Sequence, residues 1–362
     1  MVKLCCIFNY APHYRLSIYK KIDHEYDAQF YFSDMVSDIV KMDYKVFKKH
    51  PKQVRDRKIF GKLLWRKDIL TLPFKDFQHY LIIGDFSLSY FPFILLCHFL
   101  GKKVYAWGHG SKSFTGKFKW YLKWFYHHCD VFFTYSEGGK QRLENLGVPS
   151  NKLKVIYNSL NDGVDGKKQK ELGNTLFQDY FKNNYPTLLF VGRLTKVKRI
   201  DWIIKCQSYH RTKKINYNLV IIGDGPEKQY LEDLAHENKL ENNIWFYGSC
   251  YNDRELSSLI YNCDLCVSPG NVGLTALHSM SYGTPVISND DFETQMPEYE
   301  IIVKGETGNL YKKDNFDDLC NCIEDWLTSN HNREEIRDNC YKRINDRFNS
   351  NYQIKLLKEV IR

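Results

Sequence analysis

The sequence predicts an α/β protein built from two doubly wound parallel-sheet domains. The first observation is length, because 362 residues are about twice a typical single domain. The second is the alternation of short apolar runs with helical segments, which is typical of parallel sheets covered on both faces. The third is a polar, glycine-containing stretch near the middle, Asn161–Lys170, which predicts a linker between the domains.

Apolar runs rich in β-branched and aromatic residues are predicted as strands on both sides of that linker. In the first half they are Lys3–Phe8, Gln29–Phe32, Tyr80–Ile83, Lys103–Trp107, Val131–Tyr135 and Lys154–Tyr157. In the second half they are Thr187–Val191, Asn218–Ile222, Ile244–Tyr247, Leu265–Ser268, Pro285–Ser288 and Gly308–Tyr311. Ligands of such sheets bind at the carboxyl ends of the strands, so the residues that follow these runs are candidates for a site.

The domain boundaries follow from this pattern. Residues 1–160 are predicted to form an N-terminal Rossmann-like domain and residues 161–344 a C-terminal one, facing each other across a central cleft. The stretch from Asn332 to Arg362 has the pattern of a charged amphipathic helix. We expect its last part, about residues 345–362, to pack back on the first domain.

Positive charge is concentrated in the first domain. Residues 1–160 hold 26 Lys and Arg against 13 Asp and Glu, a balance of +13, whereas residues 161–362 hold 26 against 30, a balance of −4. This asymmetry indicates an anionic partner, either a lipid surface, a phosphorylated substrate or nucleic acid; a merely soluble basic domain is the alternative. The segments Lys48–Lys67 and Lys117–Phe125 interleave cations with large aromatics, as surface-lying amphipathic elements do, although half-buried helices have the same composition.

Cysteine usage and hydropathy predict a cytoplasmic protein. The eleven cysteines have irregular spacings, and we expect them to be free thiols in a reducing compartment. Cys263-x-x-Cys266 has the spacing of half a metal site, but no second pair matches it, so no metal site is predicted. The N-terminus, Val2–Phe8, has a buried-strand pattern, and the longest apolar stretch, Tyr90–Leu100, is too short to span a bilayer.

Four segments of the second half carry a specific signal. Thr187–Lys198 is a strand that ends in Gly-Arg-Leu, with a lysine five residues after the arginine. Leu219–Pro226 is a strand followed by a Gly-Asp-Gly turn, and Trp245–Gly248 is a third strand end. Ser268–Val286 holds Gly-Asn-Val-Gly-Leu before a helical stretch and ends in Gly-Thr-Pro-Val. In this order and spacing the chain resembles the retaining glycosyltransferases of family four, which have the GT-B fold.

The resemblance implies a nucleotide diphosphate sugar in the second domain and an acceptor in the first. The diphosphate is the leaving group, so its site must stabilise growing negative charge. Arg193 would offer a fork to the phosphate oxygens and Lys198 a point charge. The stretch from Leu274 to Tyr282 is predicted as a helix, and its first N–H groups would add dipole stabilisation.

Backbone near this helix completes the predicted donor site. The resemblance adds four residues before and at the helix start, Asn271, Val272, Gly273 and Leu274. Glycines at strand ends would let the backbone approach the nucleotide closely. They are Gly192, Gly223, Gly225 and Gly248, of which Gly223 and Gly225 are almost equally well explained as turn residues.

The first half resembles the family at three points. His109, in Trp-Gly-His-Gly after a strand, corresponds to the histidine beside the donor sugar and the acceptor. Asn158, in Val-Ile-Tyr-Asn-Ser-Leu, matches the asparagine that closes the first domain. Tyr10–Arg15 occupies the position of the first glycine-rich loop, but its glycines are missing, and Arg15 is the candidate replacement.

The chain departs from the family at its paired glutamates. The two positions hold Gly270 and His278. His278 can still hydrogen-bond a ribose hydroxyl, and Asn271 offers an amide beside the glycine. The departure is compatible with an inactive scaffold or with a subfamily that holds its donor differently. The Gly-Asn-Val-Gly-Leu and Gly-Thr-Pro-Val segments favour the subfamily.

The leading hypothesis is a retaining, metal-independent hexosyltransferase of bacterial surface polysaccharide synthesis, for lipopolysaccharide or capsule. It would use a nucleotide diphosphate sugar, most often UDP-linked in this family, without a cofactor. It would act on a glycan or lipid-linked acceptor at the inner face of the cell membrane. The alternative is a GT-B scaffold that binds nucleotide sugar or glycan without turnover. A dinucleotide oxidoreductase is disfavoured because the first βα turn lacks Gly-x-Gly-x-x-Gly, and no nucleic-acid-binding signature is present.

Overall fold

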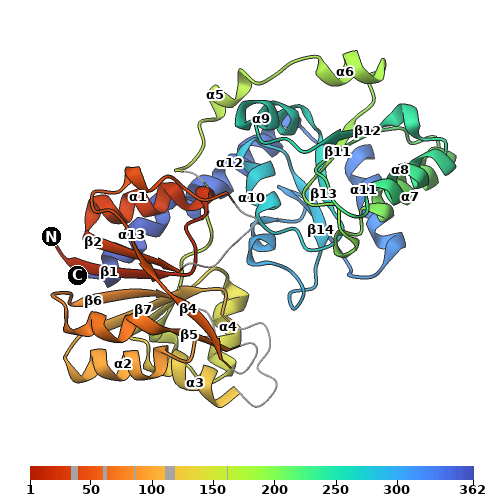
Figure 1. The fold of residues 1–362 in the computed structure, drawn as a ribbon. Helices are drawn as coiled ribbons and strands as arrows, with labels where there is room; N and C mark the ends of the chain where they lie inside the picture. Colours follow the sequence, from red (N-terminus) through yellow and green to blue (C-terminus); the bar gives the residue numbers. More distant parts are fainter. Residues whose placement is uncertain (34–39, 60–62, 85–86, 111–118, 161) are drawn as a thin grey trace. The chain divides into compact units, whose positions relative to one another are not determined.

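The computed structural model describes residues 1–33, 40–59, 63–84, 87–110, 119–160 and 162–362. The chain divides into two compact units (Figure 1). Unit 1 consists of Met1–Asp162 and Asn349–Arg362, and unit 2 consists of Gly163–Phe348. Each unit contains a parallel sheet with helices on both faces, so the predicted α/β fold class is confirmed.

Unit 1 contains a seven-stranded parallel sheet with the order β3-β2-β1-β6-β7-β8-β9. Its strands are β1 (Lys3–Phe8), β2 (Asp27–Ser33), β3 (Lys52–Val54), β6 (His79–Ile83), β7 (Lys103–Gly108), β8 (Val131–Thr134) and β9 (Leu153–Val155). Strand β1, third in this order, pairs with β2 from Lys3 opposite Asp27 and with β6 from Leu4 opposite His79. Buried apolar residues on the central strands point into cores on both faces, which is why these strands read as continuous apolar runs.

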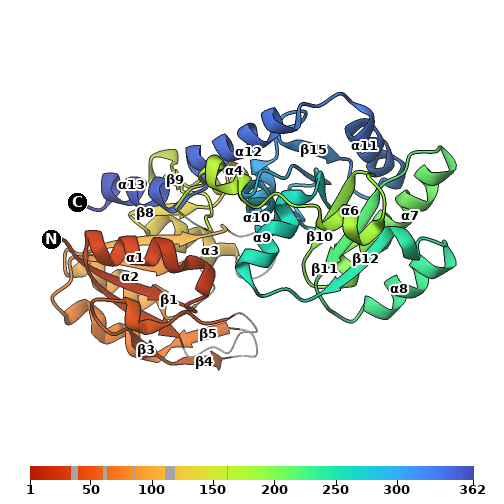
Figure 2. The same cartoon turned by 90° about the horizontal axis from the view of Figure 1, so that it is seen from above.

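Helices cover both faces of this sheet, as Figures 1 and 2 show. One core receives side chains of α1 (Leu16–Glu25) and α13 (Ser350–Val360). The other receives side chains of α2 (Tyr90–Phe99), α3 (Lys119–His128), α4 (Glu137–Asn145) and the 3-10 helix η3 (Lys67–Phe74). The remaining 3-10 turns are η1 (His13–Arg15), η2 (Tyr44–Val46) and η4 (Ser150–Lys152).

The basic segment Lys48–Lys67 is not an amphipathic helix. It forms β3 and an antiparallel hairpin of β4 (Asp56–Ile59) and β5 (Leu63–Arg66), while residues 60–62 lie outside the described chain. Arg66 is fully buried, and its Nε donates to a carboxylate oxygen of Asp56 at 3.1 Å. The short strands were missed because lysines and arginines interrupt the apolar pattern, and at least one of these cations is internal.

Unit 2 contains a six-stranded parallel sheet with the order β12-β11-β10-β13-β14-β15. Its strands are β10 (Thr187–Val191), β11 (Asn218–Ile222), β12 (Ile244–Gly248), β13 (Leu265–Ser268), β14 (Val286–Asn289) and β15 (Gly308–Tyr311). The strand order reverses between β10 and β13, which is the point where doubly wound sheets open a crevice for ligands. Its α-helices are α5 (Gly166–Lys170), α6 (Leu176–Phe181), α7 (Ile200–Thr212), α8 (Lys228–Glu237), α9 (Asp253–Asn262), α10 (Leu274–Ser281), α11 (Phe316–Thr328) and α12 (Arg333–Arg347). Its 3-10 turns are η5 (Lys196–Lys198), η6 (Glu241–Asn243) and η7 (Pro297–Ile301).

The C-terminal stretch predicted as one helix is two. α12 ends at Arg347 in unit 2, and α13 begins at Ser350 and packs against α1 in unit 1. Asn349 separates them in an extended conformation, and its side chain accepts a hydrogen bond of 2.9 Å from the backbone N–H of Tyr352. Asparagine is a preferred helix N-cap, so the break is a capped helix start.

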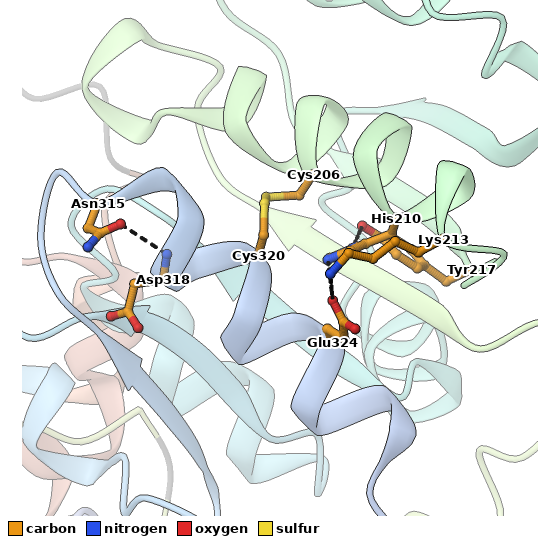
Figure 3. The surroundings of a disulfide bond; sticks show 8 residues. All are labelled: Cys206, His210, Lys213, Tyr217, Asn315, Asp318, Cys320 and Glu324. Atoms are coloured by element: carbon orange, nitrogen blue, oxygen red, sulfur yellow. Dashed lines mark hydrogen bonds and ion pairs between the residues drawn. A yellow bond between two sulfur atoms is a disulfide. The ribbon is translucent and has the colours of Figure 1, made fainter.

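The expectation of eleven free thiols is wrong at two positions. Cys206 of α7 and Cys320 of α11 form a disulfide, with their Cα atoms 5.5 Å apart (Figure 3). The two helices pack side by side, and an ion pair of 2.7 Å between Lys213 and Glu324 links the same region. The half-cystines lie 114 residues apart in sequence, so their spacing carries no signal of the pairing. The remaining nine cysteines are free.

Candidate active site

The first part of the candidate site follows β10. Gly192 comes directly after the strand, and the side chain of Arg193 is exposed. Lys198 is half-buried in η5, and its Nζ donates a hydrogen bond of 2.6 Å to the backbone carbonyl of Asn271. Burial lowers the pKa of Lys198. The hydrogen bond holds this lysine against the loop that leads into α10.

The second part is the N-terminus of α10. Its N-cap, Gly273, has a φ of +55°, where a residue with a side chain would be strained. The hydroxyl of Thr275 donates to the carbonyl of Val191 at 3.1 Å, which ties the first turn of α10 to the end of β10. His278 is half-buried on the same helix. Free N–H groups at such a terminus favour an anion.

Buried polar side chains fix the loop between β13 and α10. Gln295 is 2% exposed; its Oε1 accepts from the Val272 N–H at 3.0 Å, and its Nε2 donates to the Gly270 carbonyl at 3.2 Å. Asn289, at the end of β14, donates through its Nδ2 to the same carbonyl at 3.0 Å, while the single hydrogen of the Ser288 hydroxyl is directed to the Ser268 carbonyl at 2.8 Å. Two side-chain amides therefore hold the loop at the Gly270 carbonyl.

Gly270 stands where the resemblance places the first glutamate. Its N–H donates to the carbonyl of Lys198 at 3.1 Å, so the backbone packs directly against η5. A Cβ added at Gly270 would overlap the carbonyl oxygen of Val197. With this backbone the position has no room for a carboxylate side chain.

A cavity of about 940 Å³ lies at the carboxyl edge of the unit 2 sheet. Among the predicted site residues Asn271 lines it, together with the neighbouring Gly270, and the other predicted donor contacts do not. The rest of its wall includes Lys196, Arg199, Trp202, Tyr230 and Thr294. The cavity therefore lies beside the loop that precedes α10, and residues of η5 form another part of its wall.

The glycines at the other strand ends pack against one another. The N–H of Gly223 donates to the carbonyl of Gly248, the last residue of β12, at 2.9 Å. A Cβ at Gly223 would overlap the carbonyl oxygen of Gly192. Close packing of neighbouring strand ends is therefore sufficient reason for glycine at position 223.

The predicted residues of unit 1 lie at the carboxyl edge of its own sheet. His109 follows β7, with its ring centroid 4.9 Å from that of Tyr135. The guanidinium of Arg15 lies 5.1 Å from the Tyr135 ring centroid and 5.4 Å from that of Trp107. His109 and Arg15 are half-buried. Asn158 is buried, and its Oδ1 accepts a hydrogen bond of 3.0 Å from the N–H of the next residue.

Two family models match the chain over these groups. The family described as "Glycosyl transferases group 1" matches residues 174–343, which contain the predicted site residues of unit 2. The family described as "Glycosyltransferase Family 4" matches residues 78–163, which contain His109 and Asn158. The chain is a GT-B glycosyltransferase of the family-four type.

Several known proteins are similar to this GT-B glycosyltransferase in sequence or in fold. An uncharacterized glycosyltransferase of Methanocaldococcus jannaschii is 32% identical over 45% of the chain and 42% of its own length. The O-antigen biosynthesis glycosyltransferase WclY of Escherichia coli is 31% identical over 40% of the chain and 39% of its own length. The matched part thus spans under half of either relative. The structure of HepE from Anabaena in complex with UDP shares the fold, with a TM-score of 0.71, 16% identity, and 99% of both chains covered.

Part of the site of this glycosyltransferase was not predictable from its motifs. Asn289, at the end of β14, and Gln295, which follows that strand, lie outside the motifs, and only the folded chain brings their side chains to Gly270. The residues that the structure describes contain no cluster of three or more His, Cys, Asp or Glu arranged to hold a metal ion. None of the described helices is long and apolar enough to cross a membrane.

Proposed function

We propose that this glycosyltransferase is a retaining hexosyltransferase that uses a nucleotide diphosphate sugar, with UDP as the nucleotide. The observation that carries the proposal is the 2.6 Å bond from Lys198 to the Asn271 carbonyl. It joins a cation to the loop that leads into the α10 N-terminus, and Thr275 in the first turn of that helix bonds to Val191, two residues before the exposed Arg193. Two cations and a helix N-terminus form a site suited to a diphosphate.

The same groups fit the chemistry of transfer. The bond between the anomeric carbon and the phosphate oxygen breaks, and negative charge grows on the departing diphosphate. Arg193, Lys198 and the first N–H groups of α10 stabilise that charge. The acceptor oxygen bonds to the anomeric carbon on the face that the diphosphate leaves, and its proton passes to the departing phosphate. No protein nucleophile and no metal ion is required.

Further contacts would orient the two substrates. We assign the ribose to His278 and Gly248, and the hexose to Asn271 and the cavity beside it, where aromatic and polar side chains suit a sugar. In unit 1, we assign contacts with the sugar and the acceptor to His109. We assign Arg15 and Asn158 to substrate binding in the same unit. The acceptor would be a glycan or lipid-linked oligosaccharide of bacterial surface polysaccharide synthesis, at the inner face of the cell membrane.

A nucleotide-sugar-binding scaffold without turnover is the second candidate. The observation that favours it is Gly270, which lacks the family carboxylate and the space for one. The two candidates differ in whether the bound donor is consumed.

A donor panel separates these candidates. The full chain is titrated with UDP sugars and with sugars linked to other nucleotides, and every donor that binds is assayed for hydrolysis and transfer with excess chelator. The transferase predicts binding of at least one donor and its slow hydrolysis in chelator. Binding without release of nucleotide from any donor would identify the scaffold. Activity that requires an added divalent ion would contradict the metal-independent site.

A further inference from the structure

Helix α2 of unit 1 is apolar on both of its sides. Tyr90, Phe93, Ile94 and Cys97 face inward and are fully buried in the core. On the outer side Phe91, Leu95 and Phe99 follow one another at a spacing of four residues and are 37%, 44% and 87% exposed. A helix on a protein surface ordinarily has polar residues on its outer side, so this apolar stripe requires an explanation.

The neighbouring helix α3 extends the stripe. The ring centroid of Trp124 lies 4.3 Å from that of Phe91, so the outer sides of the two helices touch. Trp120, one turn before Trp124, is 63% exposed. We name the set Phe91, Leu95, Phe99, Trp120 and Trp124 the α2–α3 face.

The charged side chains on the two helices of this face are cations. Neither helix contains an Asp or Glu, and Lys123, beside Trp124, is exposed. The nearby acid Asp130 is already paired, with Lys103 at 2.9 Å and with His98 at 3.2 Å. Residues 1–160 carry twice as many Lys and Arg as Asp and Glu. A second copy of the same face would therefore meet like charge, whereas an anionic surface would be attracted.

We propose that the α2–α3 face docks this protein on an anionic lipid bilayer, with Phe99 and Leu95 entering the headgroup boundary and Lys123 contacting lipid phosphates. Exposed apolar and aromatic side chains beside lysines are the composition of elements that lie in a membrane interface. The inference deepens the membrane association of the proposed function by naming its surface, and it does not depend on the transfer reaction. It also moves that surface away from Lys48–Lys67, which forms strands.

Vesicle flotation of the full chain tests the proposal. Vesicles are made of phosphatidylcholine alone or with phosphatidylglycerol, and the variants are Leu95→Gln with Phe99→Gln, and Lys123→Gln. Tyr251→Gln is the control for exposed aromatic area, because Tyr251 in unit 2 is also 87% exposed. Lys20→Gln is the charge control, because Lys20 is exposed on α1, which packs on the opposite face of the sheet.

The expected result is salt-sensitive binding to the anionic vesicles and little binding to phosphatidylcholine. The double variant should bind roughly 10- to 100-fold more weakly, because two apolar side chains no longer leave water. Lys123→Gln should weaken binding several-fold, and both controls should float as the unsubstituted chain does. Circular dichroism and UDP affinity, measured on every variant, separate a loss of docking from misfolding or from failure of the donor site. Unchanged flotation of the double variant, or a dimer in light scattering that the double variant dissolves, would overturn the proposal.

Discussion

The Oε1 atom of Gln295 accepts a hydrogen bond of 3.0 Å from the backbone N–H of Val272, one residue before the N-cap of α10. Through its Nε2 the same side chain donates to the carbonyl of Gly270, so it holds the loop at two points. A donor site that relies on backbone N–H groups depends on where those groups are held.

The first prediction is that Gln295→Glu weakens nucleotide binding, although residue 295 is assigned no contact with the nucleotide. The substitution keeps the shape but turns the Nε2 donor into an oxygen that faces the carbonyls of Gly270 and Asn289. Buried acceptors left without donors cost about 1–3 kcal/mol, so we expect a lower melting temperature and roughly ten-fold weaker UDP binding. Equal UDP affinity in Gln295→Glu and the unsubstituted chain would show that the loop holds its position without this side chain.

The second prediction is that restoring the family carboxylate does not restore function. In Gly270→Glu the Cβ would overlap the carbonyl oxygen of Val197, and the loop must move. Overpacking of this kind costs about 1–3 kcal/mol, so thermal unfolding should occur at lower temperature and donor affinity should fall. Gly270→Ala, which adds the same Cβ without the carboxyl group, is the matched control. Higher turnover in Gly270→Glu than in both Gly270→Ala and the unsubstituted chain would contradict this account.

The third prediction concerns pH. Burial lowers the pKa of Lys198, so as pH rises its charge is lost earlier than that of an exposed lysine. UDP affinity should therefore begin to fall, as pH rises, below about pH 10, in the range where ordinary lysines remain charged. Lys198→Arg stays charged throughout this range and should abolish most of the decline. The same decline in Lys198→Arg would assign the titration to another group.

The fourth prediction separates two histidines by their kinetics. His109→Ala should lower turnover by about 100-fold or more with little change in UDP affinity, because its assigned role is to orient the reacting groups. His278→Ala should weaken donor binding roughly ten-fold and change turnover little, because a ribose contact serves ground state and transition state alike. Full turnover in His109→Ala would show that the catalytic centre lies elsewhere.

Sequence patterns predicted the long apolar strands because each is buried on both faces and forms an unbroken run, as β1 and β11 do. They missed β3, β4 and β5, where lysines and arginines interrupt short strands. The Gly-Arg-Leu and Gly-Asn-Val-Gly-Leu segments indicated the loops after β10 and β13, which the hydrogen bond between Lys198 and Asn271 joins. They could not reveal the hydrogen bond between Gln295 and Val272 or the disulfide between Cys206 and Cys320. Both join segments that are distant in sequence and meet only after folding.

The central claim is that Arg193 and Lys198 bind the diphosphate at the α10 N-terminus, and calorimetric titration with UDP tests it most directly. Each charge-assisted contact contributes about 1.5–3 kcal/mol, so Arg193→Ala and Lys198→Ala should each weaken UDP binding roughly ten- to a hundred-fold. Lys168→Ala, which removes an exposed charge from α5 in the same unit, should bind as the unsubstituted chain does. Unchanged UDP affinity in both Arg193→Ala and Lys198→Ala would contradict the account.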